Sequence, residues 1–226
     1  HRDSIYGNVV VGKRENQLTF FFMGMPQIVT PLPDIAFAEE FSHFPLLLHQ
    51  HPEDVLIISG GAGGVIREVL KHGVRRVDYV EIDPTIIRAL QLFPTPLTQQ
   101  ELEDERVHLH FTDGRHFLLS TSRDYDVILM GISDLSSLQM ARFFTSEFFR
   151  LAKRRLRKGG WLSFSLPGSL SYLSPGLLRV DGCVKKTLAS VFPFTCVIPG
   201  AHYLFLGCKS PLPDFPSPEI FEERLM

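Results

Sequence analysis

The chain has 226 residues, a formal net charge of -2 at pH 7, 44% hydrophobic residues and 21% charged residues. This length fits one α/β domain with a small extension, and a nearly neutral chain gives no electrostatic case for a nucleic-acid partner. Its three cysteines show no CxxC spacing, which predicts neither a zinc site nor a disulfide framework and favours a reducing, cytoplasmic compartment.

The ends of the chain suggest a piece of a longer protein. It begins at His1 without an initiating methionine or a signal peptide, and it ends at Met226 after a proline-rich segment. The sequence between them contains no run of about 18 apolar residues, so we expect no membrane-crossing helix within it.

The N-terminal segment predicts a small β unit. Extended runs between residues 6 and 24 alternate around a polar turn, which favours a β-hairpin. The proline-rich residues 30–34 then lead into a helix that we expect to run to about Leu48. The expected units are an N-terminal hairpin unit over 1–33, a nucleoside-binding domain over 34–209 and a proline-rich tail over 210–226.

Residues from Val55 onward alternate between short apolar runs, which predict strands, and amphipathic segments, which predict helices. Such alternation is typical of an α/β fold with a doubly wound, mostly parallel sheet, and we expect the last strand to be antiparallel at the edge. The predicted strands cover 55–59, 76–83, 106–111, 125–130, 160–166, 194–199 and 203–208, and the predicted helices cover 64–73, 84–93, 136–158 and 174–190.

A glycine cluster follows the first of these strands. Gly60, Gly61, Gly63 and Gly64 let the backbone turn tightly and approach a ligand, with the amides of the next helix directed at it. The loop is GGAGG, with Ala62 at its centre, rather than GxGxxG, which disfavours NAD. It has no GK(S/T) and is therefore not a P-loop.

Two acidic residues follow the next two strands. Glu81 ends the second predicted strand, where a carboxylate can accept both hydroxyls of a ribose. Asp113, followed by Gly114, comes after the third strand, where a carboxylate can accept from the exocyclic amine of adenine. The alternative is that these acids only cap helices. Together with the glycine loop they favour a pocket for an adenine nucleoside.

We predict no metal site. His49 and His51 are close in sequence, but no third ligand lies near them, so a turn before a strand explains both residues. Other histidines, among them His43, His72 and His202, have no acid or nucleophile paired with them in the sequence, so we assign them no catalytic role.

Several segments resemble the spermidine synthases, which are polyamine aminopropyltransferases. They are FPLLLHQHPEDVLIISGGAGGVIREVLKH, VDYVEID, TDGRHF and YDVIL. The resemblance extends over about residues 5–165 and implies the Rossmann-like fold of S-adenosylmethionine-dependent transferases, with a small N-terminal β unit. Within the family, the chain is most similar to bacterial spermidine synthase-like domains fused to membrane-spanning segments. That similarity implies membrane segments outside this chain, and the family implies a homodimer.

The family transfers an aminopropyl group from decarboxylated S-adenosylmethionine to a diamine and leaves methylthioadenosine. The resemblance therefore implies decarboxylated S-adenosylmethionine, S-adenosylmethionine or methylthioadenosine as the ligand, and a polyamine as the second partner. It also implies that Glu81 binds the ribose, Asp113 lies at the adenine, Gln27 lies over the nucleoside and Asp134 contacts the diamine. The implied cofactor-binding residues are Gln27, Gly60, Gly61, Ala62, Gly63, Glu81, Asp113 and Gly114.

Three positions depart from the family pattern around the transferred chain. Ala62 replaces the loop aspartate that holds the aminopropyl amine, and Gly131 replaces the catalytic aspartate. Phe37 stands where the family has a tyrosine. Removing a carboxylate partner from a partly buried ammonium costs about 2–5 kcal/mol, so these changes predict altered chemistry.

Three hypotheses follow. The first is a domain that binds an adenosyl ligand, with aminopropyl transfer lost or altered. The alternative is an active aminopropyltransferase with an unusual acceptor site, to which Glu39, Glu40 and Asp134 could supply negative charge. The third is a methyltransferase, because an alanine in the loop tolerates the methionine carboxylate better than an aspartate does.

Overall fold

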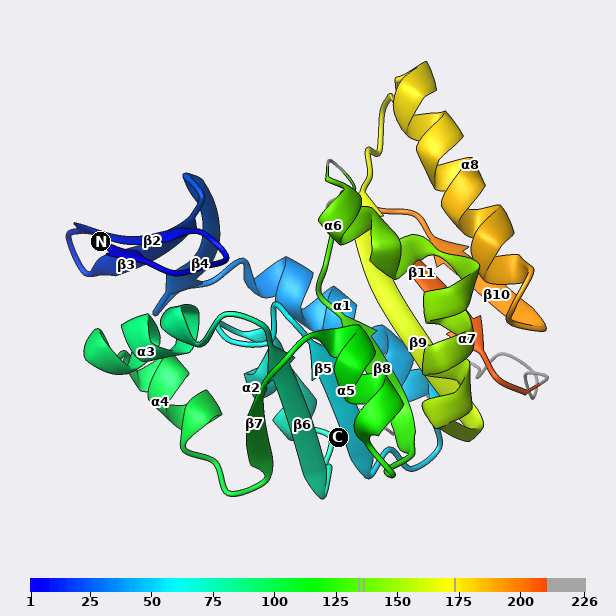
Figure 1. Cartoon of the computed structure of the whole chain (residues 1–226), viewed down its shortest axis with the longest axis horizontal. Helices are drawn as coiled ribbons and strands as arrows, with labels where there is room; N and C mark the ends of the chain where they lie inside the picture. Colours follow the sequence, from blue (N-terminus) through cyan, green and yellow to red (C-terminus); the bar gives the residue numbers. More distant parts are fainter. Residues whose placement is uncertain (134, 136, 173, 211–226) are drawn as a thin grey trace.

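The computed structural model describes residues 1–133, 135, 137–172 and 174–210, and it confirms the Rossmann-like α/β fold (Figure 1). The strands of the large sheet are β5 (Asp54–Ile58), β6 (Arg76–Glu81), β7 (Val107–Phe111), β8 (Tyr125–Met130), β9 (Leu156–Pro167), β10 (Phe194–Ile198) and β11 (His202–Cys208). Their order across the sheet is β10-β11-β9-β8-β5-β6-β7. The five strands from β9 to β7 run parallel, and β10 and β11 add an antiparallel pair at one side.

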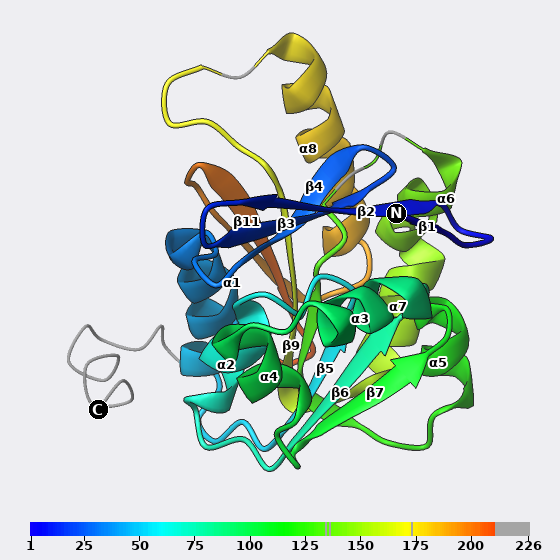
Figure 2. The ribbon, with the colours of Figure 1, turned by 90° about the vertical axis from the view of Figure 1, so that its left-hand side faces the viewer.

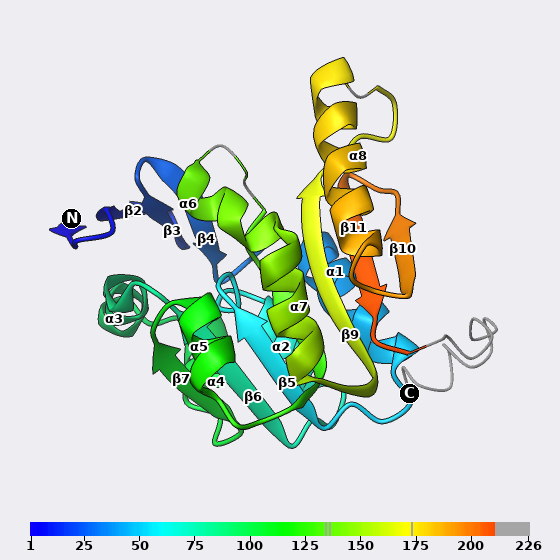
Figure 3. The same ribbon diagram turned by 45° about the vertical axis from the view of Figure 1, so that its right-hand side comes forward.

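Helices cover both faces of this sheet. They are α1 (Ile35–Leu48), α2 (Val65–Leu70), α3 (Pro84–Leu92), α4 (Pro96–Leu102), α5 (Gly114–Ser120), α6 (Leu138–Ala141), the 3-10 turn η1 (Arg142–Phe144), α7 (Ser146–Arg155) and α8 (Pro175–Ala189). The core on one face includes α1 and α2, and the core on the other includes α5 and α7 (Figure 3). The first turns of α8 project past the sheet.

Alternate residues of each strand point to opposite faces, which divides the core into two halves. In β5, Val55 and Ile57 pack on the α1 and α2 side, whereas Leu56 and Ile58 pack on the α5 and α7 side. All four are at most 2% exposed. Because both faces are covered, the strand is a continuous apolar run rather than an alternating one.

The N-terminal unit is a four-stranded antiparallel sheet that contains the hairpin expected between residues 6 and 24. Its strands are β1 (Arg2–Asp3), β2 (Asn8–Arg14), β3 (Gln17–Phe22) and β4 (Met25–Thr30). The unit lies across the carboxyl end of the large sheet (Figure 2). A Cβ added to Gly63 would lie 2.6 Å from a methyl carbon of Ile28, so β4 packs directly on the glycine loop.

Two sequence predictions about the C-terminal half are wrong. The single helix expected over 136–158 is divided into α6, η1 and α7, because the Thr145 hydroxyl caps a new helix by accepting from the Phe148 amide. That helix ends at Arg155, and β9 begins at the next residue. The last strand, β11, is antiparallel as predicted, but β10 lies outside it and forms the edge.

Helix α4 was not predicted from the sequence. This helix begins with a capping box in which the hydroxyls of Thr95 and Thr98 each accept from the other residue's amide. Thr95 also shares a buried hydrogen bond with Thr30 at the end of β4, at 2.6 Å. The helix therefore joins the N-terminal sheet to the large domain.

Candidate functional site

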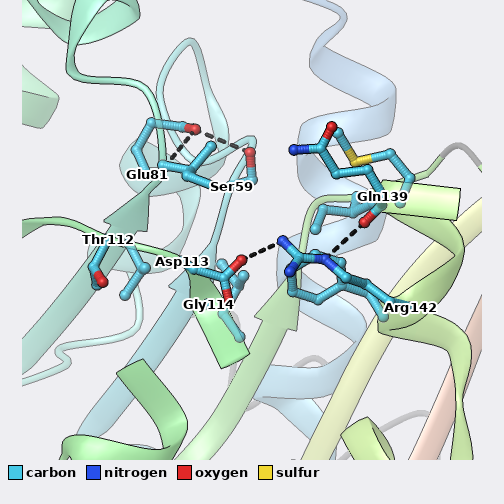
Figure 4. A pocket seen from close by; sticks show the side chains of 13 residues that line it. Ser59, Glu81, Thr112, Asp113, Gly114, Gln139 and Arg142 are labelled. Atoms are coloured by element: carbon cyan, nitrogen blue, oxygen red, sulfur yellow. Dashed lines mark hydrogen bonds and ion pairs between the residues drawn. The ribbon is translucent and has the colours of Figure 1, made fainter. Parts of the chain in front are cut away.

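A cavity lies at the carboxyl ends of three neighbouring parallel strands, β5, β6 and β7 (Figure 4). Ser59 follows β5, Glu81 ends β6, and Asp113 follows β7. α6 and η1 close the opposite side. The other lining residues are Ile58, Val80, Ile82, Thr112, Gly114, Ile132, Gln139, Met140, Arg142 and Phe143. The structure thus brings three predicted site residues, Glu81, Asp113 and Gly114, to one cavity.

Glu81 is 5% exposed, and its carboxylate is oriented by three hydrogen bonds. Oε2 accepts from the Ser59 hydroxyl at 3.0 Å and from the Tyr79 hydroxyl at 3.2 Å, and Oε1 accepts from the Ile82 amide at 3.0 Å. Burial raises the pKa of Glu81, against the lowering effect of the hydrogen bonds from Ser59 and Tyr79. A carboxylate has about four acceptor positions, so Glu81 has one left for a ligand hydroxyl.

Asp113 has two roles at once. Its Oδ1 caps α5 by accepting from the amides of Arg115 and His116, at 2.9 Å and 3.1 Å. Its Oδ2 is ion-paired with the guanidinium of Arg142. The capping alternative is therefore correct for one oxygen, while the other faces the cavity and a cation.

Arg142 is held across the cavity. Its Nε donates to the Gln139 carbonyl at 2.9 Å, and Arg115 donates to the Arg142 carbonyl at 2.9 Å. With Arg142 in this position the cavity measures about 60 Å³. Small-molecule pockets usually begin at about 300 Å³, so in this arrangement the cavity is smaller than a typical ligand pocket.

The amides at the start of α2 already have an acceptor. Glu101 of α4 is fully buried, and its carboxylate accepts from the amides of Gly63 and Gly64 at 2.7 Å each and from that of Arg67 at 3.2 Å. The expectation that these helix amides point at a ligand is therefore wrong. Burial raises the pKa of Glu101, whereas the three amides lower it.

The glycine loop borders the cavity without lining it. A Cβ added to Gly61 would lie 3.0 Å from the ring of Tyr79, so the glycine allows this ring to pack under the loop. Ala62 is 6% exposed and belongs to the core, and Gly60 and Gly63 are also absent from the lining. Gln27 is exposed on β4 and does not line the cavity either.

Gly131 lies where β8 meets the loop after β5. Its amide donates to the Ile58 carbonyl at 3.0 Å, and a Cβ at this position would overlap the carbonyl oxygen of Ser59 and lie 3.0 Å from the Gly60 Cα. This backbone therefore admits only glycine at residue 131. Asp134, the candidate acceptor-binding acid, lies outside the described residues.

Sequence reasoning missed four polar residues at the cavity, namely Ser59, Thr112, Gln139 and Arg142. Ser59 directly precedes the glycine cluster, so its place at a strand end was a usable signal. Arg142 is 29 residues from Asp113 in sequence, and no local pattern reveals such a pair.

A second polar cluster joins α1 to α2, away from the cavity lining. Ligand atoms of Glu39, His43 and Glu68 lie within 4.8 Å of one another, a grouping that could hold a metal ion. However, Arg67 and Lys71 both form ion pairs with the buried Glu68 carboxylate. Cations of the chain thus already neutralise this acid, and the absence of a metal site stays a prediction.

The comparison with known families decides the identity of the domain. The family model of the spermine/spermidine synthase domain matches residues 35–210. The chain belongs to the spermine/spermidine synthase family. Membership explains the motif set of the sequence, in which a glycine loop and two acids follow successive strands.

Curated relatives of this spermine/spermidine synthase domain are similar to it in sequence. It is 35% identical to a polyamine aminopropyltransferase of Korarchaeum cryptofilum over 59% of this chain and 41% of the relative. It is 34% identical to polyamine aminopropyltransferase 2 of Hyperthermus butylicus over 74% of this chain and 53% of the relative. The chain thus spans about half the length of these curated relatives.

A solved spermidine synthase in complex with the transition-state analogue AdoDATO has the same fold. The TM-score is 0.74 at 22% identity, covering 96% of this chain and 84% of the other. Among the described residues of the spermine/spermidine synthase domain, no helix is long and apolar enough to cross a bilayer.

Proposed function

We propose that this domain binds the adenosyl part of an aminopropyl donor and that the protein is a polyamine aminopropyltransferase with an unusual acceptor site. The observation that carries the proposal is that Glu81 and Asp113 face one cavity from neighbouring strand ends. The relatives named polyamine aminopropyltransferases support the reaction class. The chain spans about half the length of those relatives, so we propose the transferase activity for the whole protein as well.

In this proposal Glu81 accepts from one ribose hydroxyl at its free position and from the second in place of the Ser59 hydroxyl, while Tyr79 fixes the direction of its carboxylate. The ion pair between Asp113 Oδ2 and Arg142 breaks in this proposal, and the same oxygen then accepts a hydrogen bond from the adenine amine. Gly114 allows close packing here, since a Cβ on it would lie 2.5 Å from the Ile58 side chain. The border residues Gln27, Gly60, Gly61, Ala62 and Gly63 complete the proposed set.

The transfer is a displacement at carbon. The acceptor nitrogen forms a bond to the aminopropyl carbon, the bond from that carbon to sulfur breaks, and its electron pair stays on sulfur as methylthioadenosine. The sulfonium is already a good leaving group, so the protein has to align the two reactants and accept a proton from the amine. Ala62 and Gly131 carry no charge that could hold the amine or accept its proton. Acids from other segments must therefore do so.

One observation, the tight backbone packing around Gly131, favours a second function. Residue 131 admits no side chain in this backbone, which leaves no room for an acid at the position where the family carries its catalytic aspartate. An adenosyl-binding domain without transfer would need only the nucleoside half of the cavity. Decarboxylated S-adenosylmethionine, S-adenosylmethionine or methylthioadenosine would then be its ligand.

We also propose a homodimer and an attachment to membrane-spanning segments outside this chain, both on the basis of the family resemblance. Light scattering behind size exclusion tests the first, with a mass of twice 25.6 kDa as the expected result. Fractionation of cells that express the complete gene product tests the second. A monomer, or a product found only in the soluble fraction, would contradict these proposals.

The experiment that tests transfer is the release of methylthioadenosine from decarboxylated S-adenosylmethionine with a panel of amines, followed by mass spectrometry. Thermal-shift binding of methylthioadenosine is measured beside it. Release supports the transferase, and binding without release supports the second function. If methylthioadenosine neither binds nor forms, both functions are wrong.

A further inference from the structure

Ser59, the residue that follows β5, has an unusual backbone conformation. Its φ is 59°, in the left-handed region that residues other than glycine rarely adopt. Gly60 has a φ of 67°, so the turn requires this conformation at two successive residues. The Ser59 amide donates to the Val80 carbonyl at 2.8 Å, which holds the backbone in place. A serine at a position that favours glycine indicates that the side chain has a role of its own.

The Ser59 side chain lies in the cavity beside Glu81 (Figure 4). Its hydroxyl donates to Glu81 Oε2 at 3.0 Å, and the Tyr79 hydroxyl donates to the same oxygen at 3.2 Å. These two bonds fill the acceptor positions of Oε2, because a carboxylate oxygen has two lone pairs. The other oxygen, Oε1, accepts from the Ile82 amide and keeps the position that is left for a ligand.

The three donors to Glu81 differ in how easily they can move away. Tyr79 is 1% exposed, and its ring packs under the glycine loop. Ile82 donates through its backbone amide. Ser59 is only half-buried, and rotation about its Cα–Cβ bond moves the hydroxyl from one staggered position to another. Ser59 is therefore the donor that a ligand hydroxyl can replace.

We propose that Ser59 makes the cavity tolerant of adenosyl ligands that lack one of the two ribose hydroxyls. A ligand with both hydroxyls replaces the Ser59 bond to Oε2 with an equivalent one, so its second hydroxyl adds little affinity. A deoxy ligand leaves the Ser59 bond in place, and the buried carboxylate then loses no donor. The inference rests on the proposed function, because it takes Glu81 as the acceptor of the ribose hydroxyls.

The test compares the dissociation constants of methylthioadenosine and of its 2′-deoxy and 3′-deoxy analogues, measured by calorimetry on the complete chain. At least one deoxy analogue should bind the wild type within about threefold of methylthioadenosine, because exchange of one hydrogen bond for another is nearly neutral. Ser59→Ala removes the hydroxyl, so the same analogue should then bind about tenfold more weakly than methylthioadenosine, as one hydrogen bond to a charged group predicts. Methylthioadenosine itself should bind Ser59→Ala at least as tightly as the wild type.

Two further variants separate the effect of the hydroxyl from that of the backbone. Ser59→Gly also lacks the hydroxyl, but it places glycine in a conformation that glycine favours, so it should fold and show the same preference for ribose as Ser59→Ala. Glu15→Gly is the matched control, since Glu15 has a φ of 54° in the exposed turn between β2 and β3. It should leave the preference unchanged. Thermal unfolding checks that each variant is folded.

An equal preference for ribose over both deoxy analogues in the wild type and in the two Ser59 variants would overturn the proposal. Ser59 would then only shape the turn, and its loss would change the affinity for all three ligands alike. Failure of the proposed function looks different, because methylthioadenosine then does not bind the folded wild-type chain at all. The proposed role of Ser59 would be wrong in that case as well.

Discussion

Replacing Glu101 by alanine should destabilise the whole glycine loop. The fully buried carboxylate accepts three backbone hydrogen bonds, at 2.7, 2.7 and 3.2 Å, from Gly63, Gly64 and Arg67. Each bond to a charged group is worth about 1.5–3 kcal/mol, but the three share one charge and do not add fully. Removing one partner of a buried charged interaction typically costs about 3–5 kcal/mol, and we expect that range for Glu101→Ala.

Urea unfolding followed by circular dichroism measures this loss directly. For a domain of this size, the expected loss lowers the midpoint of thermal unfolding by roughly 6–20 °C. Glu101→Gln keeps one acceptor oxygen and should cost about 1–2 kcal/mol. Glu103→Ala, two residues further on and exposed, is the control and should stay within about 0.5 kcal/mol of wild type. A Glu101→Ala variant within about 1 kcal/mol of wild type would show that the Glu101 carboxylate does not stabilise the glycine loop.

Three further predictions concern the cavity and the backbone at Gly131 beside it. Arg142→Ala should tighten methylthioadenosine binding in calorimetry by up to about fivefold, since a partly exposed ion pair worth about 1 kcal/mol no longer has to break; weaker binding would show instead that Arg142 contacts the ligand. Gly131→Ala should lower the free energy of unfolding by about 2 kcal/mol or more through its clash with the Ser59 carbonyl, whereas Gly182→Ala, with open space around its Cβ, should not destabilise the chain. Burial raises the pKa of Glu81, so nucleoside affinity should fall as pH decreases through that raised value, and Glu81→Gln should bind about tenfold to hundredfold more weakly without this pH dependence. An unchanged pH profile in Glu81→Gln would count against Glu81 as the ribose acceptor.

The raised pKa of Glu81 makes the stability of the fold depend on pH in the opposite direction to ligand binding. The folded chain protonates Glu81 more readily than the unfolded chain does, because burial disfavours the charged form. Its contribution to stability is therefore present below the unfolded pKa and is lost as pH rises through the folded pKa. Ligand binding and fold stability thus respond oppositely to the protonation of one carboxylate.

Strands and helix caps could be predicted from the sequence where neighbouring residues alone determine them. Apolar runs such as Val55 to Ile58 can be placed because both faces of the sheet are covered, and Asp113 can be placed because helix capping is local. The split of the 136–158 helix also had a local signal, the capping hydroxyl at Thr145, but the apolar spacing on either side of it masked the break.

Pairs formed by distant segments could not be read from the sequence. Glu101 binds amides 34 to 38 residues away, and the surrounding segment looks polar and irregular when taken alone. Likewise, the contact between Phe37 and His202 depends on the return of β11 beside β9, which strand patterns do not specify. The family motifs predicted which residues gather at the cavity, whereas the partners that orient them came from tertiary packing.

The two halves of the proposed reaction have different physical support. The nucleoside half has an oriented carboxylate at Glu81 and a second acid at Asp113, both at strand ends. The acceptor half lacks acids at Ala62 and Gly131, so in the proposed function its negative charge comes from other segments. An enzyme built this way would keep the family's donor and change how the acceptor is held.

The most direct test of the proposed transfer is the amount of methylthioadenosine formed when the chain is incubated with decarboxylated S-adenosylmethionine and 1,4-diaminobutane. We expect methylthioadenosine and the aminopropylated amine to form in equal amounts, and Glu81→Gln to suppress both. Formation of neither product by a folded chain would contradict the proposed transfer.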